Sequence, residues 1–202
     1  ILRGSGATTK LRGSIITHGG SIQIFDSVVV EGVGPRLIDT TNNGAVAGGA
    51  VYVSGNVRSE LAMARSLTVR AGSSTATIDG AIGAAANTQL GTLSIIGLAG
   101  ITLTGGTVSS NGAQAYTGGV VLGAPLQVRT VGTTIDFNGT VTGAHRLTVA
   151  SGSGEATFAN GGSLAGLTLE AGGFRTFTAP MTIGDLQVVG GGARFTAPAA
   201  IT

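Results

Sequence analysis

The sequence predicts an all-β fold, a parallel β-helix (β-solenoid) with coils of about 20 residues. The main observation is a repeated apolar-x-apolar triplet. Its copies begin at Leu126, Leu147, Leu167 and Leu186, at intervals of 21, 20 and 19 residues. Glycine-rich breaks separate the triplets, and helical periodicity is almost absent. A repeat of this length indicates that one small unit is stacked along an axis.

A second triplet is expected in each coil. Three apolar residues each lie 11 residues after a leucine that begins a triplet: Ile78 after Leu67, Phe137 after Leu126, and Phe158 after Leu147. We therefore place these three residues at one phase of the coil. Because side chains alternate along a strand, Leu147, Val149 and Phe158 are predicted to point into a buried stripe.

Short alternating runs rich in β-branched residues predict further strands along the chain. They are Ser21–Phe25, Val28–Val30, Val51–Val53, Ala76–Ile78, Leu93–Ile95, Ile101–Leu103, Val120–Leu122 and Ile135–Phe137. Residues 59–66 are interpreted as a loop or a single turn, and residues 84–89 as a loop insertion. An antiparallel sandwich would also contain such strands, but like triplets at a fixed spacing favour coils that stack on copies of themselves.

Asx-Gly pairs are predicted to form the corners between strands. They occur at Asn43-Gly44, Asp79-Gly80, Asn111-Gly112, Asn138-Gly139 and Asn160-Gly161. Asn, Asp and Gly tolerate positive φ, which sharp turns require. Residues 1–202 are expected to form a single β-helical segment, with less regular coils in 1–66 and more regular coils in 67–202. Neither end resembles a capping unit, so we expect the segment to belong to a longer rod or to stack on like subunits.

Composition excludes several classes of protein. The 202 residues include 37 glycines without a Gly-X-Y phase, 42% hydrophobic residues and only 10% charged residues, so neither collagen nor a disordered chain is expected. The sequence contains no cysteine, which removes thiol catalysis and cysteine-ligated metals. The net charge is +2 and the arginines are scattered, so nucleic-acid binding is not expected. No apolar run is long enough to predict membrane insertion.

Residues 105–171 resemble a known bacterial repeat. An NGAQAY segment, a VVLGA segment, the run IDFNGTVTGAHRLTV and an EATF segment follow one another there. This order resembles the repeats of filamentous-haemagglutinin-like bacterial surface adhesins, which are exported by two-partner secretion or as autotransporters. The resemblance extends over about residues 13–190. It implies a right-handed parallel β-helix at the cell surface, in which repeats of this kind form the shaft.

No catalytic, cofactor-binding or metal-binding residue is predicted. A polysaccharide-degrading β-helix needs clustered carboxylates, but Asp136 is expected to point outward, with Thr77 and Thr157 at the matching positions of other coils. Asp79 is interpreted as a corner residue. Three carboxylates are expected to lie alone near breaks: Asp26, Asp39 and Asp185. His18 and His145 are expected to be exposed in turns, and Tyr52 and Tyr116 are the aromatic residues expected on the surface.

The sequence therefore predicts a structural shaft or filament-forming segment of a secreted bacterial cell-surface protein that supports adhesion or extracellular assembly. The alternative is a polysaccharide-binding or polysaccharide-degrading β-helix. We expect no enzymatic activity and no cofactor. The expected partners are flanking β-helical coils or like subunits placed end to end, together with a glycan or protein receptor on a host or neighbouring cell. The expected location is extracellular, at the cell surface of a bacterium.

Overall fold

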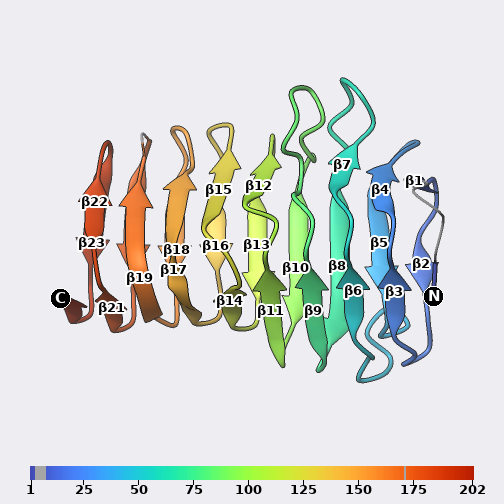
Figure 1. Ribbon diagram of the computed structural model, residues 1–202, viewed down its shortest axis with the longest axis horizontal. Helices are drawn as coiled ribbons and strands as arrows, with labels where there is room; N and C mark the ends of the chain where they lie inside the picture. The colour runs from blue at the N-terminus through green and yellow to red at the C-terminus, as the bar shows by residue number, and fades with distance from the viewer. Residues whose placement is uncertain (3–7, 171) are drawn as a thin grey trace.

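The computed structural model describes residues 1–2, 8–170 and 172–202, and in these ranges the ordered elements are strands. The strands form a β-solenoid of about nine turns with roughly 21 residues per turn. The coils follow one another along a single axis, with the N-terminus at one end of the rod and the C-terminus at the other (Figure 1). The predicted fold class is thus confirmed.

Each coil contributes strands to three faces, and every pair of neighbouring strands is parallel. The first face contains β2 (Ile15–Ile16), β5 (Arg36–Asp39), β8 (Leu67–Gly72), β10 (Leu93–Gly97), β13 (Gln114–Thr117), β16 (Ile135–Phe137), β18 (Ala156–Phe158), β20 (Phe174–Phe177) and β23 (Gly192–Phe195). The second face contains β3 (Ile22–Ile24), β6 (Val51–Val53), β9 (Thr75–Ile78), β11 (Gly100–Leu103), β14 (Val120–Leu122), β21 (Met181–Ile183) and β24 (Ala199–Ile201).

The third face contains β1 (Thr8–Leu11), β4 (Ser27–Val30), β7 (Val57–Ser59), β12 (Thr107–Ser110), β15 (Leu126–Thr130) and β22 (Leu186–Val188). Two longer strands, β17 (Val141–Ala150) and β19 (Gly162–Leu169), begin on the second face and end on the third. Between β7 and β12, a bridge from Ile82 to both Val57 and Val108 continues the third face through one more coil.

The repeated leucine triplets stack as the sequence predicted. Leu126 pairs with Leu147, Leu147 with Leu167, and Leu167 with Leu186 along the third face. Leu147, Val149 and Phe158 are fully buried, so their predicted inward orientation is confirmed. Burial of side chains of this size contributes roughly 1.5–3 kcal/mol each.

A column of aromatic rings fills the first face in the C-terminal half of the rod. Rings of Tyr116, Phe137, Phe158, Phe177 and Phe195 are stacked with centroid separations of 5.0, 4.9, 4.6 and 4.5 Å. These separations match the spacing of neighbouring strands. The expectation that Tyr116 is exposed was wrong, because register pairs it with Phe137 inside the coil and its side chain is fully buried.

A buried polar cluster accompanies the first ring of this column. The Tyr116 hydroxyl donates to Oε1 of Gln114 at 2.6 Å, and Nε2 of Gln114 donates to the Ser110 hydroxyl at 2.9 Å and to the Arg129 carbonyl at 2.7 Å. Gln114 and Ser110 are fully buried. Hydrogen bonding offsets the cost of removing these groups from water.

The phase assigned to Leu67 and Ile78 was wrong. Leu67 stacks on Leu93 in the first face, whereas Leu126 lies in the third face. Ile78 accordingly pairs with Leu103 on the second face, and only Phe137 and Phe158 stack on each other. The N-terminal coils contain longer loops, which shift the triplets from one face to the next.

Glycine serves two different purposes at the predicted corners. Positive φ occurs at Asn43 (59°), Gly44 (92°) and Gly161 (64°) but at neither Gly80 nor Gly139. The latter two lie where coils approach closely. A Cβ on Gly80 would be 2.1 Å from the Gly55 carbonyl oxygen, and one on Gly139 would be 2.1 Å from that of Gly118. Asp79-Gly80 follows the second face and Asn138-Gly139 the first, so these corners do not share one phase.

Candidate functional site

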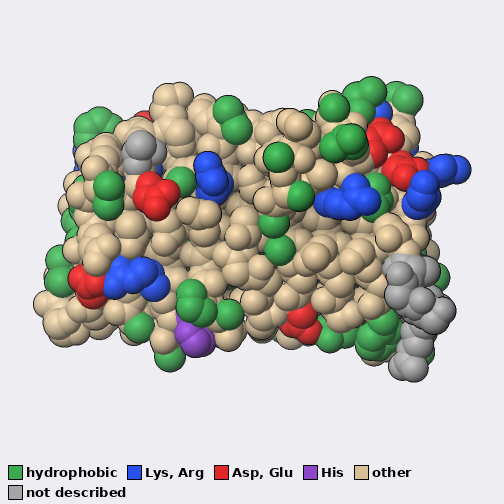
Figure 2. Space-filling view, turned by 45° about the horizontal axis from the view of Figure 1, so that its top comes forward, with side chains coloured by type: hydrophobic (Ala, Val, Ile, Leu, Met, Phe, Trp, Pro, Cys, Tyr) green, Lys and Arg blue, Asp and Glu red, His purple; other side chains and the backbone are tan. Residues whose placement is uncertain are grey.

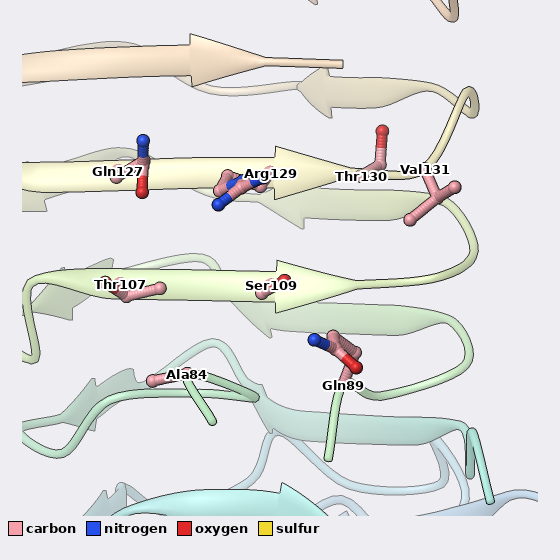
Figure 3. Close-up of a pocket in the computed structure, with 8 residues that line it drawn as sticks. All are labelled: Ala84, Gln89, Thr107, Ser109, Gln127, Arg129, Thr130 and Val131. Atoms are coloured by element: carbon pink, nitrogen blue, oxygen red, sulfur yellow. The ribbon is translucent and has the colours of Figure 1, made fainter. Parts of the chain in front are cut away.

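The third face carries a polar groove beside a loop. A hollow of about 210 Å³ is lined by Ala84, Gln89, Thr107, Ser109, Gln127, Arg129, Thr130 and Val131. Figure 3 shows Thr107 and Ser109 on β12, Gln127 and Arg129 on β15, and Gln89 rising from the loop beside them. Side chains from three successive coils therefore surround the hollow.

The insertion predicted at residues 84–89 forms the wall of this groove. The chain pairs with Val108 at Ile82 and with Ser110 at Leu90, and it leaves the ladder between these two bridges. The loop projects from the same edge of the rod as the loop that follows β7 (Figure 1). Thr88 holds it with a hydrogen bond to the Ala85 carbonyl at 2.8 Å, and Asn87 has a φ of 58°. The loop thus stands beside Ser109.

Two neighbouring hollows extend the groove along the rod. One of about 120 Å³ shares Ala84 and is also lined by Asn56, Val57, Arg58, Ala81, Ala85 and Thr88. Another of about 180 Å³ shares Gln127 and is also lined by Gly106, Pro125, Leu126, Arg146 and Thr148. We call the three together the third-face groove; it extends from β7 to β17.

Positive charge without a counterion characterises the groove. Register places Arg58, Gly83, Ser109 and Arg129 in one outward column, because Val57, Ile82, Val108 and Val128 follow one another in the ladder. The residues that line the groove include no Asp or Glu. The ion pairs of the described residues use Lys10, Arg12, Arg65, Arg70 and Arg146 instead.

Arg146, at the far end of the groove, is neutralised. Its guanidinium pairs with Asp185 and donates to the Thr168 hydroxyl at 3.0 Å. Arg58 and Arg129 therefore carry the uncompensated charge of the groove. In the view of Figure 2, acidic and basic side chains lie against one another at the lower left and the upper right.

The expected isolation of Asp136 is confirmed, although one predicted neighbour was wrong. Asp136 is the outward residue of β16, and it lies between Ala115 and Thr157 in the first face. Thr77 lies on the second face instead, where it pairs with Tyr52 and Thr102. No carboxylate stacks on Asp136 in either direction.

The three carboxylates expected to lie alone are all bonded. Asp185 pairs with Arg146, and Asp26 accepts a hydrogen bond from the Thr9 hydroxyl at 3.3 Å. Asp39 is fully buried and lies 3.5 Å from Arg70 of the next coil. These contacts link coils that the sequence separates widely, so the sequence alone did not show them.

Asp39 organises the loop that follows β5. It accepts hydrogen bonds from the Thr41 amide and hydroxyl, both at 2.7 Å, and from the Asn43 amide at 2.8 Å. Burial alone would raise the pKa of Asp39, but these hydrogen bonds and the charge of Arg70 outweigh burial and lower it. The carboxylate is therefore a structural anchor.

Asp79 and Tyr52 form a second structural contact. The Tyr52 hydroxyl donates to Asp79 at 2.7 Å, and the Thr104 hydroxyl donates to the same carboxylate at 2.9 Å. Tyr52 is half-buried and packs edge-on against Phe25 at 5.7 Å. The hydrogen bond to Asp79, helped by burial and the carboxylate charge, raises the pKa of Tyr52.

The two histidines are separated. His18 is exposed, as predicted, and pairs with Thr41, whereas His145 is half-buried within β17 and not fully exposed. In the described ranges, no group of three or more His, Asp or Glu side chains is placed to hold a metal ion. Likewise, no helix there is long and apolar enough to span a membrane.

Arg58 and Arg129 were not singled out by sequence reasoning. Their only signal is that each occupies the outward position of a triplet-like strand, in VRS and LQVRT. That signal becomes visible only when the register of the coils is known.

The chain was compared with protein families, curated proteins and solved structures. No family model, curated protein or solved structure matches the chain.

Proposed function

We propose that this chain is a shaft or filament-forming segment of a secreted bacterial cell-surface protein, without enzymatic activity. The observation that carries the proposal is the uninterrupted stacking of coils along one axis, with parallel strands on three faces. A rod of this kind separates whatever lies beyond its two ends. Adhesion or extracellular assembly uses such a spacer between a cell and its target.

The interior suits a load-bearing role. The leucine ladder of the third face and the aromatic column of the first run across several coils, and within them residues of one kind stack on each other. Solenoids of this type gain stability from contacts between neighbouring repeats. A force along the rod is then distributed over many hydrogen bonds and stacked side chains.

Flanking coils or like subunits are the proposed partners at the ends. Parallel strands pair through their backbone edges, so a coil of the same kind can continue each of the three faces. The resemblance to adhesin repeats supports the bacterial surface location and a glycan or protein receptor.

Electron cryomicroscopy of the native material tests this proposal. We expect the rod to continue at its ends into further coils of the same kind, with the strand spacing of about 4.8 Å visible along the axis. If the ends of the rod were instead covered by an unrelated structure within a compact particle, the proposal that this chain is a shaft segment would be contradicted. Release of reducing ends from polysaccharides by the purified protein would contradict the absence of enzymatic activity.

A further inference from the structure

We propose that the third-face groove binds a carboxylate-bearing polysaccharide, with Arg129 as the main contact and Arg58 as a second. This site adds a ligand surface to the rod and does not depend on the shaft function. It rests on the shape of the groove, its uncompensated charge and the types of polar group that line it.

The charge of the groove favours an anionic ligand. Arg129 is exposed, Arg58 is half-buried, and neither has an ion pair among the described residues. A planar guanidinium binds carboxylates through two parallel hydrogen bonds. The absence of acidic residues from the lining means that an incoming carboxylate meets no repulsion inside the groove.

The neutral residues of the lining suit sugar hydroxyls. Gln89 and Gln127 each offer an amide that both donates and accepts, and Thr107 and Ser109 offer hydroxyl groups. Gln127 and Arg129 point out of β15 next to Thr107 and Ser109 of β12 (Figure 3). Such a mixture recognises alternating hydroxyl and carboxylate groups better than an apolar molecule.

The ligand is expected to be extended along the rod. Arg58 and Arg129 are three coils apart in one outward column, a distance of about 14 Å at 4.8 Å per coil. Between them lies the base of the 84–89 loop, where a Cβ on Gly83 would be 2.3 Å from the Ser109 carbonyl oxygen, so the ligand is expected to pass alongside this loop. A polymer with regularly spaced carboxylates can reach both arginines at once, which a single sugar acid cannot.

Nucleic acid fits this groove less well. Binding to phosphate backbones depends on many cationic contacts, and the groove offers two guanidinium groups without an ion pair among the described residues. Its lining residues include no aromatic side chain on which bases could stack.

Calorimetric titration with oligogalacturonate, a polymer of sugar acids, tests the site. Arg129→Gln should weaken binding roughly tenfold, because it removes a charge-assisted contact, and Arg58→Gln should weaken it roughly threefold. Arg194→Gln is the matched control: Arg194 is exposed and points outward on the first face, away from the groove. Its replacement should leave the affinity unchanged. Circular dichroism checks that each variant keeps its strands.

Three further titrations separate the proposed ligand from other anions. Neutral dextran and polyglutamate should bind at least tenfold more weakly than oligogalacturonate, and single-stranded DNA should not compete with it. The proposal is overturned if the wild-type chain does not bind oligogalacturonate, or if Arg194→Gln weakens binding as much as Arg129→Gln. Equal binding of polyglutamate shows a general polyanion site, and competition by DNA shows a nucleic-acid site; either result overturns the glycan proposal.

Discussion

The coils before Ile101 and the coils after it share three faces, but they differ in length and in interior. Along the second face, pairs of stacked residues before this point are 29, 25 and 25 residues apart. After it they are 19, 21, 21, 19 and 18 residues apart. The inward column of the first face changes at almost the same place, from Ile38, Val69 and Ile95 to stacked aromatic rings.

The comparison teaches that coil length and core identity are separate properties. The extra residues of the long coils lie in loops at or near the corners, where added chain runs over the surface without disturbing the stacked strands. The strands stay paired from coil to coil, and the register shifts after Ile96 and after Gly143. A loop of the long coils creates the wall of the third-face groove. The long coils contribute Arg58 to its lining, and the short coils contribute Arg129.

Replacement of Val149 by aspartate should have the largest effect. Val149 is fully buried between Val128 and Leu169 in the C-terminal coils. A carboxylate without a partner in this stripe should lower the free energy of unfolding by several kcal/mol. Hydrogen exchange of the amides in β15, β17 and β19 measures the loss. Unchanged protection would show that the side chain of residue 149 does not face the interior.

Replacement of Phe158 by leucine tests whether the aromatic column stabilises the short coils. Phe158 is stacked between Phe137 at 4.9 Å and Phe177 at 4.6 Å, so the change removes two ring contacts and should cost about 1–3 kcal/mol. Ile95→Leu in the long coils conserves volume and should cost less than about 1.5 kcal/mol. Denaturant unfolding of the two variants compares the regions, and equal losses would contradict a special role for the rings.

The close approach of coils at Gly80 predicts an effect of similar size. Gly80→Ala forces a methyl group against the Gly55 carbonyl, and should destabilise the protein by about 1–3 kcal/mol. Gly13→Ala is the control, because no atom lies within 4 Å of its added Cβ; it should change stability by less than about 0.5 kcal/mol. Thermal unfolding of both variants decides whether backbone contact between coils, and not turn geometry, requires glycine at position 80.

The smallest expected effect concerns acid stability in the long coils. Since the pKa of Asp39 is lowered in the folded state, its ionised form stabilises the fold above the ordinary carboxyl range. This contribution is lost as the pH falls through the lowered pKa. Asp39→Asn should therefore be less stable than the wild type at neutral pH and should approach it in acid. Asp136→Asn, on the surface, should show no such convergence when melting temperatures are compared.

Local pattern was sufficient to predict much of the fold. The ladder from Leu126 to Leu186 could be recognised because stacked coils place like residues on each other. Tyr116 could not be assigned correctly, because its burial depends on pairing with Phe137 in the next coil. The face on which Leu67 lies was predicted wrongly for a related reason. The long loops move a triplet to another face without changing its sequence. The groove could not be predicted without the register, since only the order of the coils places Arg58 and Arg129 in one column.

The buried cluster of Gln114, Ser110 and Tyr116 has a consequence for folding fidelity. Because neighbouring coils are alike, a chain shifted by one whole coil would still stack apolar residues on apolar residues, and the hydrophobic effect would barely distinguish the two alignments. The cluster adds a polar contact to this apolar matching. Two of its hydrogen bonds join residues of one short segment, and the third joins the Gln114 amide to the Arg129 carbonyl of the next coil. Any coil that stacks there must therefore offer a backbone carbonyl at that place, or it leaves a buried amide without a partner.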